Sequence, residues 1–379
     1  MDHTLDLKDP QWGAEAVRRI QELRTEFADE AAECRKAVTF PRETLKAMAR
    51  AGLVGIMTPP RYGGYGGGPP EYCLVAEATA RHDLVSPQIM VQGQRWLVDW
   101  GTDAQKEKYL PGMAAGTLLF SASISEPNAG SSLRKLRTTA RRVGADWVID
   151  GVKTHVNLGV ECQVTLVYAM AEEGLTAFLV DADLPGVSSR RTHAVGCQLV
   201  PTADMIFDNV RVPASAVLGE PGKAMATFFS TFNISRLGNA SELLGFAQRG
   251  LAEAIEYARR REIGSNTVTG FQGIQWIIAD CYASLYAASL ARDRAANIAA
   301  RGDDPSMATS LAKKLAIDAA EETINEVFAL VGGHGLYHTQ PWGDLLMEIK
   351  TLRVAGGSLE VLRNHLADQI LKDPQLKGL

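Results

Sequence analysis

The chain has 379 residues, of which 46% are hydrophobic and 22% are charged. This composition is typical of a water-soluble protein with enough apolar material for two or three packed domains. The net charge of -5 and the sequence pI of about 5.9 exclude the long-range attraction that nucleic-acid and anionic-membrane binders show. A polyphosphate site remains open only as a local basic patch.

Five cysteines are scattered without a CxxC or another ligand-like spacing, so the sequence signals neither a disulfide framework nor a zinc site. The N-terminal stretch has no basic segment followed by an apolar one. No run approaches the roughly 18 to 20 apolar residues that a membrane span requires. We therefore expect a cytoplasmic protein that binds neither nucleic acid nor membrane.

The first third of the chain has a helical pattern. Apolar residues such as Val17 and Ile20 recur every three to four positions, and another periodic stretch follows Pro41, which suits a first helical turn. Glycine and proline crowd into residues 59–70, which indicates a loop. We expect an N-terminal α-helical domain over residues 1–118.

The middle and last parts of the chain differ in period. Residues 119–222 contain short segments rich in Val, Thr and aromatic residues, with turn residues between them, which predicts a compact β domain. From residue 223 the helical period returns in four segments, the last of which carries Val361, Leu362 and Leu366. Short loops join these segments, so we expect a four-helix bundle over residues 223–379 and an α+β fold class overall.

Five separate stretches carry recognisable motifs. They are S-E-P-N-A-G-S at 125–131, G-V-K at 151–153, F-D-N-V-R-V-P at 207–213, F-Q-G-I-Q at 271–275 and G-G-H-G at 332–335. Small residues with hydroxyl and backbone N–H groups suit a close approach to a flavin ring and a phosphate. In this order the stretches resemble the acyl-CoA dehydrogenase flavoprotein family from end to end. The resemblance implies an N-terminal α-helical domain, a central β-barrel-like domain and a C-terminal four-helix bundle.

The resemblance implies FAD as the cofactor. The expected cofactor-binding residues are Ser123, Ser125, Ser131, His155, Asn157, Arg261, Gln272, Gly332, Gly333 and Ser358. Arg261 and Gln272 would reach the cofactor of a neighbouring subunit, which implies a homodimer or homotetramer. Arg260 is the alternative to Arg261, and Ala329 replaces a glutamine that usually contacts the neighbour's cofactor.

The resemblance also locates a change at the reacting centre. Most members of the family remove the α-proton of an acyl thioester with the glutamate of an E-G-T motif, and counting without gaps puts Gly356 at that position. Some members carry the base on the first bundle helix, where this chain has Ser235, and a hydroxyl alone is too weak a base for a C–H bond. Glu242 stands seven residues further, roughly 10 Å along a helix, so we expect that it does not occupy the place of the base.

In the family the thioester carbonyl is polarised by a backbone N–H at this position and not by the glutamate side chain. Gly356 still supplies that N–H. By family position, Asn233 and Arg236 are candidates for substrate contacts, each against a structural role. His334 and His338 have a chelating spacing, but the glycines around them indicate a turn, so we expect no metal.

The expected function is that of an FAD-dependent oxidoreductase acting at the α,β-bond of an acyl-CoA without the usual glutamate base, with electron-transfer flavoprotein as a possible partner. The G-G-S sequence after Ala355 resembles branches that lack the glutamate, among them a 3-sulfinopropionyl-CoA desulfinase and a crotonobetainyl-CoA reductase. Non-redox elimination, as in the desulfinase, is therefore an alternative. Tailoring of an acyl group bound to an acyl carrier protein is another.

Overall fold

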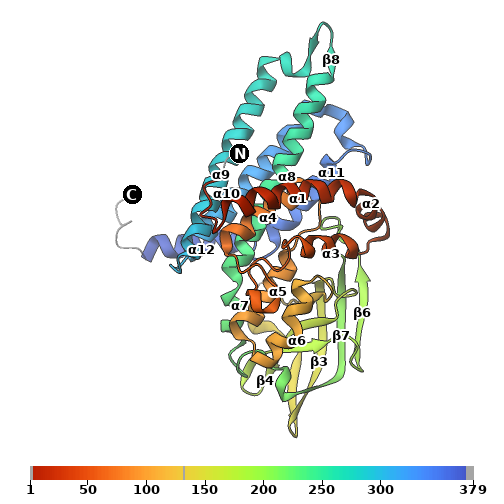
Figure 1. The fold of residues 1–379 in the computed structure, drawn as a ribbon, viewed down its shortest axis with the longest axis vertical. Helices are drawn as coiled ribbons and strands as arrows, with labels where there is room; N and C mark the ends of the chain where they lie inside the picture. Colours follow the sequence, from red (N-terminus) through yellow and green to blue (C-terminus); the bar gives the residue numbers. More distant parts are fainter. Residues whose placement is uncertain (1–2, 131–132, 373–379) are drawn as a thin grey trace.

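A computed structural model of the chain describes residues 3–130 and 133–372. The N-terminal part consists of helices α1 (Pro10–Glu26), α2 (Ala28–Ala37), α3 (Arg42–Arg50), α4 (Pro69–Arg81), α5 (Gln88–Trp100) and α6 (Asp103–Ala114). Asp9 begins α1 by accepting a hydrogen bond from the Gln11 N–H, with Pro10 at the first helical position. Thr102 caps α6 in the same way through the Gln105 N–H. These helices lie beside both of the other parts of the molecule (Figure 1).

The middle part is a single seven-stranded sheet in the order β1-β4-β2-β3-β7-β6, with β5 paired to β4. Its strands are β1 (Phe120–Ser123), β2 (Thr139–Val143), β3 (Asp146–Asn157), β4 (Val164–Ala171), β5 (Gly174–Asp181), β6 (Val187–Thr192) and β7 (Thr202–Pro213). The β1–β4 and β2–β4 pairs are parallel and the others are antiparallel. Strands β4 and β5 are buried along almost their whole length, as expected of strands covered on both faces.

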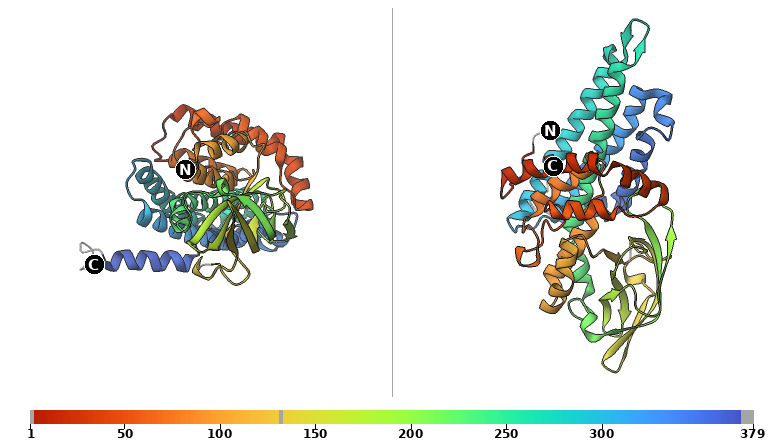
Figure 2. Two further views of the ribbon diagram at one scale, coloured as in Figure 1. Left: turned by 90° about the horizontal axis from the view of Figure 1, so that it is seen from below. Right: turned by 45° about the vertical axis from the view of Figure 1, so that its right-hand side comes forward.

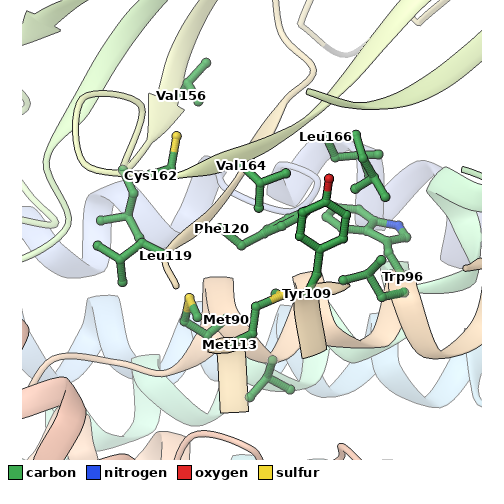
Figure 3. Packing of buried hydrophobic residues seen from close by; sticks show 14 of the residues in the cluster. Met90, Trp96, Tyr109, Met113, Leu119, Phe120, Val156, Cys162, Val164 and Leu166 are labelled. Atoms are coloured by element: carbon green, nitrogen blue, oxygen red, sulfur yellow. The ribbon is translucent and has the colours of Figure 1, made fainter. Parts of the chain in front are cut away.

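Helices α5 and α6 cover the end of the sheet next to β1. Trp96 and Tyr109 from these helices meet Phe120 and Leu166 of the sheet in one buried cluster (Figure 3). A Cβ atom at Gly93 of α5 would lie 2.4 Å from the Phe120 ring. The helix and the strand therefore approach too closely for any other residue at this position.

The C-terminal part is helical again. It contains α7 (Ala224–Ser230), α8 (Phe232–Arg260), α9 (Gln272–Ala300), α10 (Ser306–Val331), α11 (Trp342–Val354) and α12 (Leu359–Lys372), with the short strands β8 (Glu262–Ile263) and β9 (Asn266–Thr267) between α8 and α9. The tip of the α8–α9 hairpin and the end of α12 both project from the body (Figures 1 and 2). No helix in the two described ranges is long and apolar enough to cross a membrane.

The end of the bundle differs from the single last helix that the sequence predicts. The structure has two helices, α11 and α12, separated by a turn in which Gly356 and Gly357 have φ values of +60° and +93°. Two consecutive residues in this region break a helix, and glycine adopts the conformation without steric cost. The pattern analysis missed α11 altogether.

A buried ionic cluster joins the N-terminal helices to the bundle. The guanidinium of Arg292 on α9 donates hydrogen bonds to Glu77 of α4 at 2.6 Å, to Asp293 at 2.7 Å and to Ser241 of α8 at 2.7 Å. All four side chains are at least 96% buried. Removing the guanidinium would therefore leave two buried carboxylates without their counter-ion.

We predict that Arg292→Met lowers the free energy of unfolding by about 3–5 kcal/mol, because the methionine fills the space but neutralises neither carboxylate. Chemical denaturation followed by circular dichroism measures the effect. Arg294→Met is the matched control, since Arg294 is exposed on the same helix, and it should change stability by about 0.5 kcal/mol or less. Equal stability of the two variants would show that the cluster does not hold the two parts together.

Candidate active site

The more enclosed of two described pockets, called the main pocket below, has a volume of about 510 Å³ and lies where all three parts of the chain meet. Helix α8 contributes Ser235, Asn239 and Glu242, and the turn after α11 contributes Gly356. The α4–α5 connection, the segment between β6 and β7, and α11 supply the other walls. Three of the residues that the sequence singled out, Ser235, Glu242 and Gly356, therefore line one cavity.

Gly356 faces the side chains of α8. A Cβ atom built on it would lie 2.4 Å from Asn239 Nδ2 and 2.8 Å from Ser235 Oγ. Asn239 Nδ2 donates to the carbonyl of Ala355 at 3.1 Å and so ties the turn to α8. Within the described ranges no acceptor is hydrogen-bonded to the N–H of Gly356, which leaves that donor free beside the pocket.

Lys313 of α10 holds the same turn from the opposite side. Its buried ammonium donates to the carbonyl of Gly357 at 2.8 Å and also to that of Ala355. Burial, aided by the charge of Arg236, lowers the pKa of Lys313 to about 7. The two carbonyl groups that flank Gly356 are thus fixed, and with them the orientation of its peptide.

Glu242 lies in the same pocket as Gly356 and stands two helical turns beyond Ser235 on α8. Its carboxyl group is hydrogen-bonded to the Ser86 hydroxyl. Burial raises the pKa of Glu242 to about 8, and the nearby charge of Glu348 raises it further although the Ser86 hydrogen bond opposes the shift. Glu242 is therefore largely protonated at neutral pH. Glu242 and Gly356 line the same pocket, and the expectation that Glu242 does not occupy the place of the base stays a prediction.

Glu348 of α11 orders the loop that closes one wall. Its carboxylate accepts hydrogen bonds from the backbone N–H groups of Cys197 at 2.7 Å and Gln198 at 3.2 Å. A Cβ atom at Gly196 would lie 2.5 Å from the carbonyl oxygen of Met347, so the loop packs directly against α11. The sequence offered no signal for this contact, which joins residues 150 positions apart.

The S-E-P-N-A-G-S and G-V-K motifs meet through an ion pair. Lys153 is fully buried and donates to Glu126 at 2.9 Å and to the Ile124 carbonyl at 3.0 Å. Burial opposes ionisation of Glu126, but hydrogen bonds from Thr138, Lys153 and the Arg137 N–H hold its pKa at about 2. The pair fixes the loop on the strand, which gives a structural reason for both motifs.

The sheet residues that are expected to bind the flavin differ in their exposure and in their hydrogen-bond partners. Asn157, at the end of β3, lines the main pocket, while His155 is exposed in a left-handed conformation (φ +55°) at a β-bulge. Ser125 is half-buried and its carbonyl accepts from the Thr154 N–H at 2.9 Å. Ser123 is buried and its hydroxyl is bonded to Thr165 at 2.7 Å, inside the sheet. Ser131 lies outside the described residues.

A second pocket lies at the α8–α9 hairpin and contains Arg261, one of the two residues expected to serve a neighbouring subunit. It is lined by Tyr257, Arg261, Ile263, Val268, Phe271, Ile274, Ala329, Leu330, Val331, Gly332, Gly333, His334 and Tyr337. Arg260 instead points to Glu256, which favours Arg261 as the phosphate ligand. Gln272, the first residue of α9, is exposed next to this pocket.

The remaining predicted residues line neither pocket. Asn233 accepts a hydrogen bond from Thr309 at 2.8 Å. Arg236 is buried, donates to Ser310 at 2.9 Å and lies over the Phe232 ring. Ser358 stands just before α12, where its hydroxyl accepts from the Val361 N–H at 3.5 Å. These contacts are structural, and the roles expected for the three residues in binding stay predictions.

No group of three or more His, Cys, Asp and Glu side chains in the described part of the chain is arranged to hold a metal ion. His334 stacks on the ring of Tyr257 with 4.8 Å between the ring centres. It belongs to the short 3-10 helix Gly332–Leu336, so the turn expected around it is present.

Comparison with known families identifies the family to which this three-part chain belongs. The chain matches the family models for the acyl-CoA dehydrogenase N-terminal domain over residues 14–117, the middle domain over 121–210 and the C-terminal domain over 223–371. The chain therefore belongs to the acyl-CoA dehydrogenase family. The resemblance drawn from the five motifs and the expected fold class are both confirmed.

Three relatives illustrate the range of reactions in the family. The chain is 32% identical to a 3-(aryl)acrylate reductase of Clostridium sporogenes, covering 93% of this chain and 98% of the relative. It is 31% identical to the CarC subunit of the caffeyl-CoA reductase-Etf complex of Acetobacterium woodii, covering 93% and 95%. It is also 31% identical to a 3-sulfinopropanoyl-CoA desulfinase of Paraburkholderia xenovorans, covering 94% and 96%.

Solved structures agree with this placement. Butyryl-CoA dehydrogenase of Megasphaera elsdenii has a TM-score of 0.92 at 25% identity, covering 98% of this chain and all of that one. A glutaryl-CoA dehydrogenase of Mycobacterium smegmatis, with a TM-score of 0.87 at 26% identity, covers 94% of this chain and 95% of its own and was solved in complex with FADH2. Membership of this flavoprotein family confirms that the protein is an FAD enzyme.

We predict that Gly356→Ala destabilises the protein by about 1–3 kcal/mol, because a Cβ is strained at φ +60° and collides with Asn239. Thermal or chemical unfolding measures the loss. Gly343→Ala is the control, since that glycine lies in α11 with open space around it, and it should be neutral or slightly stabilising. An equally tolerated Gly356→Ala would mean that the turn relaxes freely.

Proposed function

We propose that this protein acts at the α,β-bond of an acyl thioester, with FAD as cofactor and without a carboxylate base at position 356. The observation that carries the proposal is the free N–H of Gly356 in a pocket whose nearest side chains, those of Ser235 and Asn239, bear no charge. A free N–H at this point suits the carbonyl oxygen of a thioester. Neither neighbouring side chain suits abstraction of a carbon-bound proton.

The residues present fit the cofactor. When bound, FAD supplies the group that accepts or gives a hydride at the β-carbon. Asn157 and Ser125 are the described residues that we assign to its flavin end, and Arg261, Gly332 and Gly333 to the phosphates of a neighbouring subunit's cofactor. The two glycines suit this role because nothing lies within 4 Å of a Cβ built on either, so a phosphate can approach the backbone closely.

The chain's own groups favour the reductive direction. Reduction delivers a proton to the α-carbon instead of removing one, and a water molecule can supply that proton because the thioester enolate is strongly basic. A positioned carboxylate is therefore not required in this direction. The Gly356 N–H would stabilise the negative charge on the carbonyl oxygen, and Lys313 would hold that N–H in place through the carbonyls on either side. Two relatives in this family are reductases, and one belongs to a complex with Etf. We therefore keep electron-transfer flavoprotein as the proposed partner.

Non-redox elimination is the second candidate, and the desulfinase relative supports it. A good leaving group on the β-carbon would also make a strong α-base unnecessary. The observation that separates the two is whether the flavin changes its redox state during turnover. A carrier-protein-bound acyl group stays a prediction for the form of the thioester.

We predict that butyryl-CoA binds but reduces the flavin slowly, about 10²- to 10⁴-fold below the rate of an enzyme with a positioned base. Stopped-flow bleaching of the flavin measures the rate. A carboxylate supplied by Gly356→Glu should raise it only when Asn239→Ala removes the amide that collides with the new Cβ. Asn239→Ala alone is the control and should stay slow. Fast reduction by the unmodified protein would contradict the proposal and point to Glu242 as the base.

We also propose a homodimer or homotetramer. An exposed apolar face on α9 carries Trp276, Tyr282 and Tyr286, whose exposed fractions are 61%, 53% and 41%. An apolar face of this kind, next to a pocket with a phosphate-type arginine, suits a second copy of the chain.

We predict that analytical ultracentrifugation finds a dimer or tetramer with one FAD per chain. Trp276→Glu combined with Tyr282→Glu should shift it towards the monomer and weaken FAD retention. The exposed Arg294→Glu on the same helix is the control and should change neither. A fully FAD-loaded monomer would rule out a shared cofactor site.

A further inference from the structure

The wall of the main pocket formed by α8 is mostly polar. The residues that face the pocket are spaced by three or four positions and form one stripe: Ser235, Asn239, Glu242, Phe246, Arg249 and Glu253. At 1.5 Å per residue the stripe runs for roughly 27 Å. Pockets that accept alkyl groups are lined mainly by apolar side chains. This stripe has one apolar residue, so the side of a ligand that lies along α8 meets polar groups, while walls such as the one that carries Leu84 and Val85 are apolar.

The polar groups opposite the middle of the stripe are arranged as a network. In the orientation that satisfies its neighbours, the Gln88 amide nitrogen donates to Glu242 Oε2 at 2.9 Å and to Asn239 Oδ1 at 3.1 Å. The Ser86 hydroxyl also contacts the Glu242 carboxyl and accepts from the Gln88 N–H at 3.1 Å. Asn239 and Glu242 are 1% and 4% exposed. No Lys, Arg or His within the described ranges forms an ion pair with Glu242. Ser86 and Gln88 both donate to this carboxyl group, so neither accepts from the O–H of its protonated form, and that O–H can reach a ligand in the pocket.

The charge state of the pocket restricts the ligand. Burial raises the pKa of Glu242 to about 8, so at neutral pH the group offers one O–H donor and one carbonyl acceptor. The cation next along the stripe, Arg249, is already paired with Asp83 at 2.6 Å and with Glu253 at 2.8 Å. On the stripe of α8, a carboxylate on the ligand would therefore find no unpaired arginine beside Glu242. An alkyl group would leave the O–H of the protonated carboxyl without an acceptor, because Ser86 and Gln88 only donate to it.

We infer that Glu242 determines specificity by hydrogen-bonding an uncharged hydroxyl on the acyl group, roughly 10 Å along α8 from Ser235. The inference rests on the proposed function, because it takes the thioester to lie at Gly356. A hydroxyl on the ring of a 3-arylacryloyl group lies at a suitable distance from its thioester, and the 3-(aryl)acrylate and caffeyl-CoA reductases among the relatives are consistent with an aryl substrate.

The test is a binding measurement on the oxidised holoenzyme with cinnamoyl-CoA and 4-hydroxycinnamoyl-CoA, which differ by the one hydroxyl. With the flavin oxidised these unsaturated thioesters cannot be reduced, so isothermal titration calorimetry gives Kd directly. We expect 4-hydroxycinnamoyl-CoA to bind about 10- to 100-fold more tightly, the difference that an unpaired buried polar group produces. Equal Kd values in the unmodified protein would overturn the inference.

Variants assign the preference to one side chain. Glu242→Leu should abolish it, mainly by weakening the binding of 4-hydroxycinnamoyl-CoA, while Glu242→Gln should keep most of it because the amide is also a donor and an acceptor. Glu256→Leu is the matched control, since Glu256 is exposed on α8 and should keep the full preference. A Glu242→Leu variant that retains the preference would also overturn the inference.

The same binding experiment distinguishes a failure of the proposed function from a failure of the inference about Glu242. If neither arylacryloyl thioester nor butyryl-CoA binds, the proposed function on CoA thioesters is wrong, and the inference falls with that proposal. If all three bind and the two arylacryloyl thioesters have the same Kd, the proposed function stands and only the role of Glu242 is wrong.

Discussion

The pocket exists because helix α4 is held against α8 and α9. The Arg292 guanidinium makes this contact specific, since it is hydrogen-bonded to Glu77 of α4, Asp293 of α9 and Ser241 of α8 with no access to solvent. The segment that follows α4 carries Ser86 and leads into α5, which begins at Gln88. Fixing α4 therefore fixes the polar wall that faces Glu242 and Asn239. A shift of α4 along α8 would break the hydrogen bonds that join Ser86 and Gln88 to Glu242 and Asn239.

The turn at Gly356 depends on a second buried cation. Lys313 reaches the carbonyls on both sides of the glycine, and Asn239 reaches one of them from α8. These contacts hold a backbone conformation that needs glycine and leave one N–H free at the pocket. The Gly356 N–H is thus a rigidly held hydrogen-bond donor at a position that carries no side chain. Rigid donors of this kind stabilise developing negative charge without reorganisation.

The two described pockets divide between them the residues that we propose for cofactor and substrate. Asn157 and Gly356 belong to the pocket at the junction of the three parts, whereas Arg261, Gly332 and Gly333 belong to the pocket at the far hairpin. The linings of the two pockets share no residue, and this separation is what the proposed oligomer would bridge. The polar stripe of α8 then makes the first pocket the place where substrates are distinguished, because buried donors and acceptors reject groups that cannot pair with them.

The sequence by itself determined the order of helical and strand regions, the family, the cofactor and the glycine at position 356, because periodicity and short motifs are local properties. It also held a signal for Asn239, four residues after Ser235 and so on the same face of a helix, which the pattern analysis did not use. Only the tertiary structure brought Glu242, Ser86 and Glu348 to one cavity and placed Lys313 beneath Gly356. These contacts join residues from 42 to 156 positions apart, and no local pattern encodes them. Burial then decided their chemistry, since the same carboxyl on an exposed helix would be ionised at neutral pH.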